Sequence, residues 1–222
     1  MYQAIGVSGL LKGFGYVVVG LALLLATGAW GYLPELQNLT LNRFAASVIG
    51  GMALIWVLGQ TAMFPWICRN MGLWRWFPPI DGRYQVEMAS NWSVVQARSQ
   101  GDAATEFDAA ADAFSKVGTM TITARLLDVH VHLEMDDGYS QSDTIACSLR
   151  PASGGGPPHL YYVYRAEVPV PKSSDSEQHH GAARIPLPKR KDLSELSGTY
   201  WTDRNWHKGL NTAGRISLNQ VC

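Results

Sequence analysis

This sequence contains few cysteines and has no excess of either charge. Its 222 residues include three cysteines, an odd number with no paired spacing, which argues against a disulfide framework or a zinc site and fits a reducing compartment. Eighteen basic residues balance eighteen acidic ones, so the formal net charge is zero. A protein that follows a DNA or RNA backbone needs many lysines and arginines on phosphates, so the balance argues against that function. A ligand with one or two phosphates requires far fewer.

Charge is missing altogether from two long apolar stretches near the N-terminus, residues 13–33 and 45–68. Each is as long as the roughly 20 residues that an α-helix needs to cross a bilayer. A cleaved signal peptide has a shorter apolar run and no second span after it. A buried hairpin of a soluble protein is the other alternative, and it rarely carries two uncharged runs of this length. We therefore expect residues 1–72 to form a hairpin of two transmembrane helices.

The few charges around these stretches predict how the hairpin is oriented. Lys12 precedes the first stretch, while Arg69 and Arg75 follow the second. Because positive residues favour the cytoplasmic side, we expect both termini and the long C-terminal part in the cytoplasm. The second stretch also contains small residues four apart, a spacing found where membrane helices pack closely. These are Ala46, Ser47, Gly50 and Gly51.

The remainder of the chain, residues 73–222, alternates apolar and polar residues over many short segments. Residues 83–92, 119–126 and 128–135 follow this period of two, and five more segments resemble them. Clusters of Ser, Gly and Pro separate the segments. Numerous short strands without intervening helices predict an antiparallel barrel or sandwich.

Residues 102–118 depart from this alternation. Asp102 is a possible N-cap, Lys116 lies in the predicted last turn and Gly118 is a stop signal. Phe107 and Phe114 are seven residues apart, so they would share one face of a helix. We expect a short helix lying over one end of the β-domain.

The sequence gives limited support to two other functions, metal binding and hydrolysis. His130, His132 and Glu134 alternate on one strand face and, together with His179 and His180, form a candidate metal site. A solvent-facing polar strand face explains the same alternation, and no cluster of Cys or Asp supports the metal. The sequence has no G-x-S-x-G nucleophile elbow, which leaves hydrolysis weakly supported.

Aromatic and polar residues at period two are more informative. Tyr162 and Tyr164 share a face in one predicted strand, and Tyr200, Thr202 and Arg204 share a face in another. If these faces line a barrel interior, they present rings, a hydroxyl and a guanidinium to one cavity. Such groups suit a nucleotide, because bases stack on aromatic rings and the planar guanidinium binds phosphate. The alternative is a set of core aromatics with one surface arginine.

The order of these features resembles the membrane effectors of CBASS anti-phage defence, which are two-transmembrane, β-strand-rich proteins associated with cGAS-like CD-NTases. The resemblance covers essentially the whole chain. Its most specific parts are L-x-Y-x-Y (160–164), H-x-G-x-A (179–183), G-x-Y-W-T-x-R (198–204) and T-x-G-x-I (212–216). The Ala-rich segment 102–116 looks longer than expected for the family.

The resemblance implies a compact antiparallel eight-stranded lipocalin-like β-barrel over residues 73–222 that binds a cyclic dinucleotide made by the partner CD-NTase. Binding would drive oligomerisation of the transmembrane helices, disruption of the bacterial inner membrane and abortive infection. The protein would then be a receptor without catalytic residues, cofactor or metal. A membrane-tethered enzyme or a lipid-handling barrel is the rival hypothesis.

Eight residues are the expected ligand contacts. Tyr162 and Tyr164 would stack on bases or form the wall of the cavity, Arg204 would meet phosphate, and His179 and Thr202 would hydrogen-bond polar edges. The full set adds one tyrosine and two further arginines as candidates: Tyr162, Tyr164, His179, Tyr200, Thr202, Arg204, Arg125 and Arg215.

Overall fold

The structure is a computed structural model that describes residues 12–20, 40–75, 77–101, 113–150, 156–188 and 192–221. Helical residues 12–20 are followed by α2 (Thr40–Gln60), α3 (Met63–Asn70) and the short 3₁₀ helix η2 (Leu73–Arg75). The rest of the chain forms β1 (Gly82–Ser90), α4 (Trp92–Ser99), β2 (Phe114–Ala124), β3 (Val129–Met135), β4 (Gln141–Arg150), β5 (His159–Glu167), β6 (Gln178–Pro186), β7 (Glu195–Thr202), η4 (Trp206–Lys208) and β8 (Ala213–Val221).

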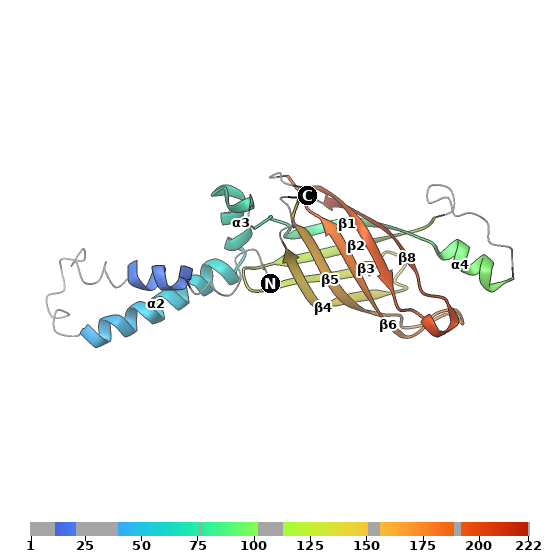
Figure 1. Ribbon diagram of the computed structural model, residues 1–222, viewed down its shortest axis with the longest axis horizontal. Coiled ribbons are helices and arrows are strands. Elements are labelled where there is room, and N and C mark those ends of the chain that lie inside the picture. Colours follow the sequence, from blue (N-terminus) through green and yellow to red (C-terminus); the bar gives the residue numbers. More distant parts are fainter. Residues whose placement is uncertain are drawn as a thin grey trace.

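The eight strands form one closed antiparallel barrel. Each strand pairs with the next along the chain, and β8 closes the barrel by pairing with β1 (Figure 1). The period-two pattern explains this fold, because alternate residues of β2, β3 and β5 are buried inside the barrel. The predicted antiparallel eight-stranded barrel is confirmed. A barrel of this size is just wide enough for side chains to fill it or for one small ligand.

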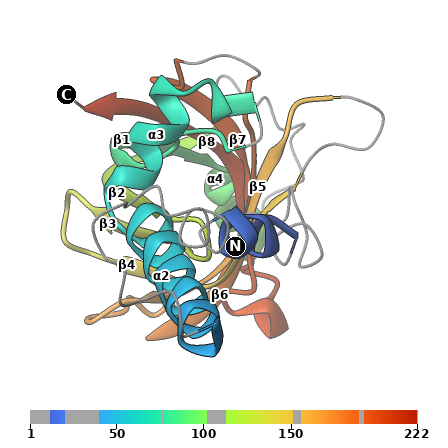
Figure 2. The same cartoon turned by 90° about the vertical axis from the view of Figure 1, so that its left-hand side faces the viewer.

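Apolar side chains fill the end of the barrel that faces α2 and α3. Ile80, Tyr84, Leu149, Leu160 and Ile185 have no exposed surface there. Burying a large apolar side chain in this way contributes about 1.5–3 kcal/mol. This end is therefore a packed core, and Figure 2 shows the helices gathered in front of it.

The helix α3 is part of that packed end, although it lies on the hairpin side of the boundary expected at residue 72. Its Phe64 and Cys68 belong to the barrel's buried apolar cluster. The Phe64 ring packs edge-on against Phe77, with 5.4 Å between ring centroids. The helix thus covers the closed end of the barrel.

A sharp bend separates α2 from α3, where the sequence predicts one continuous helix over residues 45–68; that prediction is wrong. The two segments, Ala45–Gln60 and Met63–Asn70, are bent by 80°. Pro65 is the physical reason, because it has no N–H for the Thr61 carbonyl and its ring would clash with that carbonyl in a continuous helix. Thr61 O instead accepts a hydrogen bond from Phe64 N (3.1 Å). Gly59 O accepts one from Leu126 N, which ties α2 to the β2–β3 turn.

Within the described ranges, no single helix has the length and apolar composition of a membrane span. The bent pair Ala45–Gln60 and Met63–Asn70 meets that test when its two parts are taken together. The first predicted span, residues 13–33, is described only as far as residue 20. The rest of that span lies outside the described residues.

Of the four small residues in α2, Gly51 packs against the helix at residues 12–20. Ser47 is buried, and a Cβ added at Gly51 would lie 3.2 Å from Val18 Cγ2. Ala46 and Gly50 are exposed instead. The small-residue spacing therefore allows close packing on one face of α2 and leaves the other face uncovered in this single chain.

Two local predictions are wrong beside the open end of the barrel. The strand expected over residues 83–92 stops at Ser90, because Trp92–Ser99 is the helix α4. The helix expected over residues 102–118 does not include its last part, because β2 begins at Phe114 and pairs with β1. Residues 102–112 lie outside the described residues.

Candidate functional site

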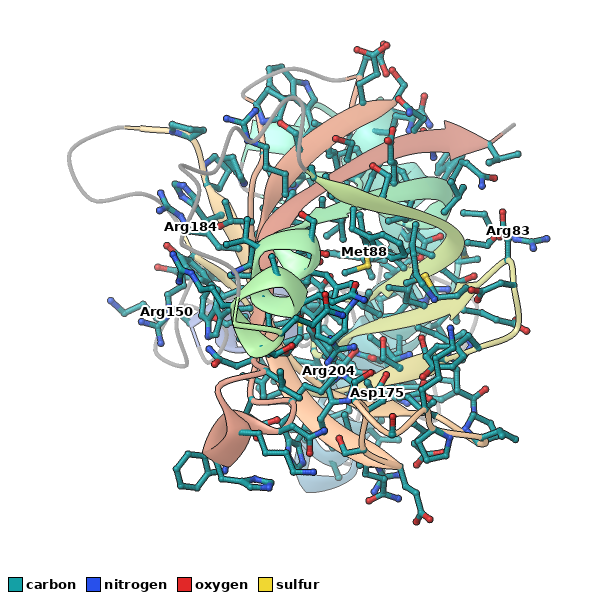
Figure 3. All side chains as sticks on the ribbon, turned by 90° about the vertical axis from the view of Figure 1, so that its right-hand side faces the viewer. Arg83, Met88, Arg150, Asp175, Arg184 and Arg204 are labelled. Atoms are coloured by element: carbon teal, nitrogen blue, oxygen red, sulfur yellow. The ribbon has the colours of Figure 1, made fainter. Side chains whose placement is uncertain are left out.

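A cavity of about 190 Å³ lies inside the barrel at the end opposite α2. Its walls come from the last residues of odd-numbered strands and the first residues of even-numbered strands, and Trp92 of α4 lies at its mouth. Figure 3 looks at this end and shows α4 in front of the barrel, with Arg204 and Asp175 close beside it. Six of the eight expected contact residues line the cavity: Tyr162, Tyr164, His179, Tyr200, Thr202 and Arg204.

Buried tyrosines form the aromatic wall. The rings of Tyr162 and Tyr164 on β5 lie 5.8 Å apart between centroids and are inclined by 43°. Burial raises the pKa of both phenols, and that of Tyr200, above the ordinary value of about 10. The three hydroxyls therefore stay protonated at neutral pH.

The motifs H-x-G-x-A and L-x-Y-x-Y are partners across the β5–β6 pair. Tyr164 stands opposite Gly181, and Tyr162 stands opposite Ala183. A Cβ at Gly181 would lie 2.3 Å from Cζ and Oη of Tyr164, so this tyrosine lies directly over the glycine backbone. The small residues on β6 thus make the space that the two rings occupy.

Arg204 follows β7 and brings a guanidinium to the mouth of the cavity. Its side chain is 17% exposed, and Nη1 donates to Asp175 Oδ2 at 3.2 Å. The guanidinium also lies over the Trp92 ring, 4.4 Å from its centroid. Nε is buried and has no hydrogen-bond partner among the described residues. A ligand anion therefore finds an arginine that is held in place but not fully hydrogen-bonded.

Tyr139 connects the rest of the rim. Its hydroxyl donates to Asp175 Oδ2 (3.0 Å) and accepts from Lys172 N (3.3 Å). The ammonium groups of Lys116 and Lys172 lie 4.4 and 5.5 Å from the Tyr139 ring centroid.

Burial lowers the pKa of His179, which keeps its ring neutral at pH 7. The charged lining residues are then three cations against one carboxylate, and the site is net positive.

Polar groups on β6 and β7 complete the site. His179 Nδ1 is buried and has no hydrogen-bond partner in the described parts of the chain. Thr202 Oγ1 lies 3.0 Å from Thr212 Oγ1 and accepts from Thr212 N at 3.2 Å. These groups offer hydrogen bonds to the polar edge of a bound molecule.

The structure places the other two candidate arginines elsewhere. Arg125 lies at the closed end of the barrel, where Nη1 forms an ion pair with Asp81 Oδ1. Arg215 points outward from β8 and is exposed. A strand's alternation assigns a side chain to one of two faces, but it does not say at which end of the barrel that side chain lies, nor which face is inside.

The proposed histidine face points away from the cavity. His130 and His132 of β3 both approach Asp143 Oδ1 from outside the barrel, at 3.5 and 2.9 Å. Across the residues that the structure describes, no group of three or more His, Cys, Asp or Glu side chains is placed to hold a metal ion. The solvent-facing alternative therefore describes where these side chains lie.

Five residues of the mouth are not identified by the sequence pattern. Trp92 and Lys116 fall in segments whose secondary structure is predicted wrongly. Tyr139, Lys172 and Asp175 lie in connections between strands, where no period marks an inward face. The available signal is topological, because every second turn of an antiparallel barrel lies at the same end.

Comparison with known proteins gives one partial similarity. No protein-family model matches the chain. Over 61 residues the chain is 34% identical to "CD-NTase-associated protein 15" of Escherichia albertii. The match covers 28% of this chain and 31% of that protein, so the chain spans less than a third of the relative it matches. The similarity links part of the chain to a CD-NTase-associated protein.

Proposed function

We propose that this protein is a non-enzymatic receptor whose barrel binds a cyclic dinucleotide through the cavity at its open end. The observation that carries the proposal is the combination of buried tyrosine rings with a net positive, arginine-containing mouth. Aromatic stacking contributes about 1–3 kcal/mol per base. A guanidinium binds phosphate through two parallel hydrogen bonds.

The cavity is too small to enclose a whole cyclic dinucleotide, so part of the ligand would stay outside it. Pockets that enclose a drug-sized ligand usually measure about 300–1,000 Å³, whereas this cavity measures about 190 Å³. One base therefore fits against Tyr162 and Tyr164, while the phosphates remain at the mouth. There they meet Arg204 and the two ammonium groups beside Tyr139, those of Lys116 and Lys172.

The proposed downstream action follows the family that the sequence resembles. The name of the matched relative associates it with a CD-NTase, and such an enzyme would supply the cyclic dinucleotide. Binding would then drive self-association of the N-terminal hairpin in the bacterial inner membrane, with both termini in the cytoplasm. Disruption of that membrane would produce abortive infection.

Calorimetric titration of the full-length chain in detergent tests the receptor function. The probes are cyclic di-AMP, cyclic di-GMP and cyclic di-UMP, with a fluorescent fatty acid for the lipid-handling alternative. We expect saturable binding of at least one cyclic dinucleotide. Binding of the fatty acid together with none of the three dinucleotides would contradict the proposal.

A further inference from the structure

The arginine of the proposed anion site already holds an anion from its own chain. The Asp175 side chain is 5% exposed, and in the described part of the chain it forms an ion pair with Arg204, at 3.2 Å. A buried carboxylate beside the phosphate-binding group opposes an anionic ligand, because two like charges at one site repel each other. A mouth built solely to attract phosphate would not place it there.

Asp175 keeps hydrogen bonds that do not depend on Arg204. Tyr139 donates its hydroxyl to Oδ2 at 3.0 Å, and Ser176 donates its backbone N–H to Oδ1 at 2.9 Å. Lys172, whose ammonium lies 5.5 Å from the Tyr139 ring centroid, belongs to the same turn. The carboxylate therefore remains hydrogen-bonded when the guanidinium takes another partner.

Arg204 is equally able to exchange its partner without leaving the mouth. Its stacking on Trp92 does not involve the in-plane N–H groups. Its bond to Asp175 uses Nη1, while Nε has no hydrogen-bond partner among the described residues. A phosphate that displaces Asp175 can form two charge-assisted hydrogen bonds with the guanidinium, whereas Asp175 accepts one, at 3.2 Å.

We infer that Asp175 is an internal counterion that holds Arg204 in the empty barrel and yields it to a phosphate of the bound ligand. This inference rests on the proposed receptor function. The carboxylate lowers the affinity of the site, because a ligand can pair with Arg204 only by displacing Asp175. It also makes the site selective, since a phosphodiester replaces the lost negative charge and an uncharged nucleoside does not.

The variant Asp175→Asn tests the inference in the full-length chain in detergent, titrated with cyclic di-AMP, cyclic di-GMP, cyclic di-UMP and adenosine. Asparagine keeps the shape: its Oδ1 can accept from Ser176 N while its Nδ2 donates to the Tyr139 hydroxyl, and thermal unfolding checks the fold. Asp143→Asn is the matched control, because Asp143 is 53% exposed outside the barrel, where it pairs with His130 and His132 and not with a cation of the cavity mouth. Both variants remove one negative charge.

We expect Asp175→Asn to bind the dinucleotide preferred by the wild type about tenfold more tightly, the scale of one charged hydrogen bond. Asp143→Asn should stay within about twofold of wild type, and adenosine binding should not change. Weaker or unchanged dinucleotide binding by Asp175→Asn overturns the inference, as does an equal gain in Asp143→Asn. If the wild type and both variants bind none of the three dinucleotides, the receptor proposal itself fails.

A second variant keeps the inference testable if Asp175→Asn does not fold. Tyr139→Phe removes a hydrogen bond from Asp175, so the carboxylate depends more on Arg204 and dinucleotide affinity should fall several-fold. Where Asp175→Asn does fold, Tyr139→Phe should have no effect in that background. An equal loss in both backgrounds would mean that Tyr139 contacts the ligand directly and would contradict its action through Asp175.

Discussion

Replacing Arg204 should weaken ligand binding much more than it weakens folding. It is stacked on Trp92 and hydrogen-bonded to Asp175 at the rim, outside the packed core. We expect Arg204→Ala to weaken dinucleotide binding about ten- to a hundredfold, because a charge-assisted contact is worth about 1.5–3 kcal/mol. Arg204→Lys should restore part of the loss, since an ammonium cannot form the planar fork.

Calorimetry on the full-length chain measures both variants, with thermal unfolding as the check of the fold. Arg215→Ala is the control, because it removes an arginine from the outer face of β8. Unchanged affinity in a folded Arg204→Ala protein would place Arg204 outside the binding site.

We expect His179 to make dinucleotide binding depend on pH. Burial lowers its pKa, and the nearby charged groups are Asp175, Arg204, Asp203 and His180. A bound phosphate favours the charged imidazolium and so raises the pKa of His179 in the complex. Affinity should therefore increase as the pH falls through the pKa of the complex, and should level off below the pKa of the free protein.

Titrations between pH 8 and pH 5 measure this effect. His179→Gln should flatten the profile. His180→Gln should not, because His180 is 55% exposed and pairs with Asp203 outside the cavity. An identical pH dependence in His179→Gln and wild type would show that another group is responsible.

Gly181 determines whether the Tyr164 ring can lie over β6. Gly181→Ala would place a Cβ 2.3 Å from the ring, so the ring must move. We expect a loss of roughly 1–3 kcal/mol in the free energy of unfolding, as for other overpacked sites. In a Tyr164→Ala background the same substitution should have little effect, and thermal unfolding of the four proteins measures the coupling. Equal destabilisation in both backgrounds would contradict the close approach.

At the scale of elements, α2 presents two faces with different roles. A Cβ at Gly51 would meet Val18 of the neighbouring helix, whereas Gly50 and Ala46 are exposed. Gly51→Leu should therefore disturb the hairpin of a single chain. Gly50→Leu should leave the hairpin and dinucleotide binding intact but separate neighbouring chains, because bulk at a small-residue seam prevents close packing.

Membrane insertion, calorimetry and a cell-killing assay distinguish the two variants. We expect Gly50→Leu protein to insert and bind but no longer to kill cells. Ile49→Leu is the control, since it keeps a large side chain at an exposed position of the same helix. Full toxicity of Gly50→Leu would show that the exposed small-residue face is not the seam between chains.

Strands with a strict period were predictable from the sequence, whereas α4 and the bend before α3 were not. The alternation around Tyr162 and Tyr200 gives the correct inner face of β5 and β7. The helix α4 has no buried residue, so it has no apolar face that a pattern could show. The bend before α3 depends on Pro65, whose effect is hidden within an uncharged run.

The remaining site residues depend on how the barrel closes. Lys116, Tyr139 and Asp175 come from β2, the β3–β4 connection and the β5–β6 connection. Their meeting at one end follows from antiparallel closure, but contact between Tyr139 and Asp175 depends on the shape of two loops. No local sequence pattern contains that information.

On the scale of the whole molecule, α4 and the N-terminal helices lie at opposite ends of the barrel (Figure 1), and the cavity is at the α4 end. At the closed end, α3 covers a packed core, and Leu126 N donates a hydrogen bond to Gly59 O of α2. The proposed function therefore requires that a ligand bound at one end of the barrel changes how the N-terminal hairpins associate at the other end. A ligand can do so only if it binds the assembled form more tightly than the separate chain.

Cross-linking of the full-length chain in membranes, with and without a bound cyclic dinucleotide, tests this claim most directly. We predict that the dinucleotide shifts wild-type protein from monomer to larger species, and that Arg204→Ala protein shows no shift at the same concentration. The account is contradicted if wild-type protein is equally oligomeric without the dinucleotide, or if the Arg204→Ala variant assembles to the same extent.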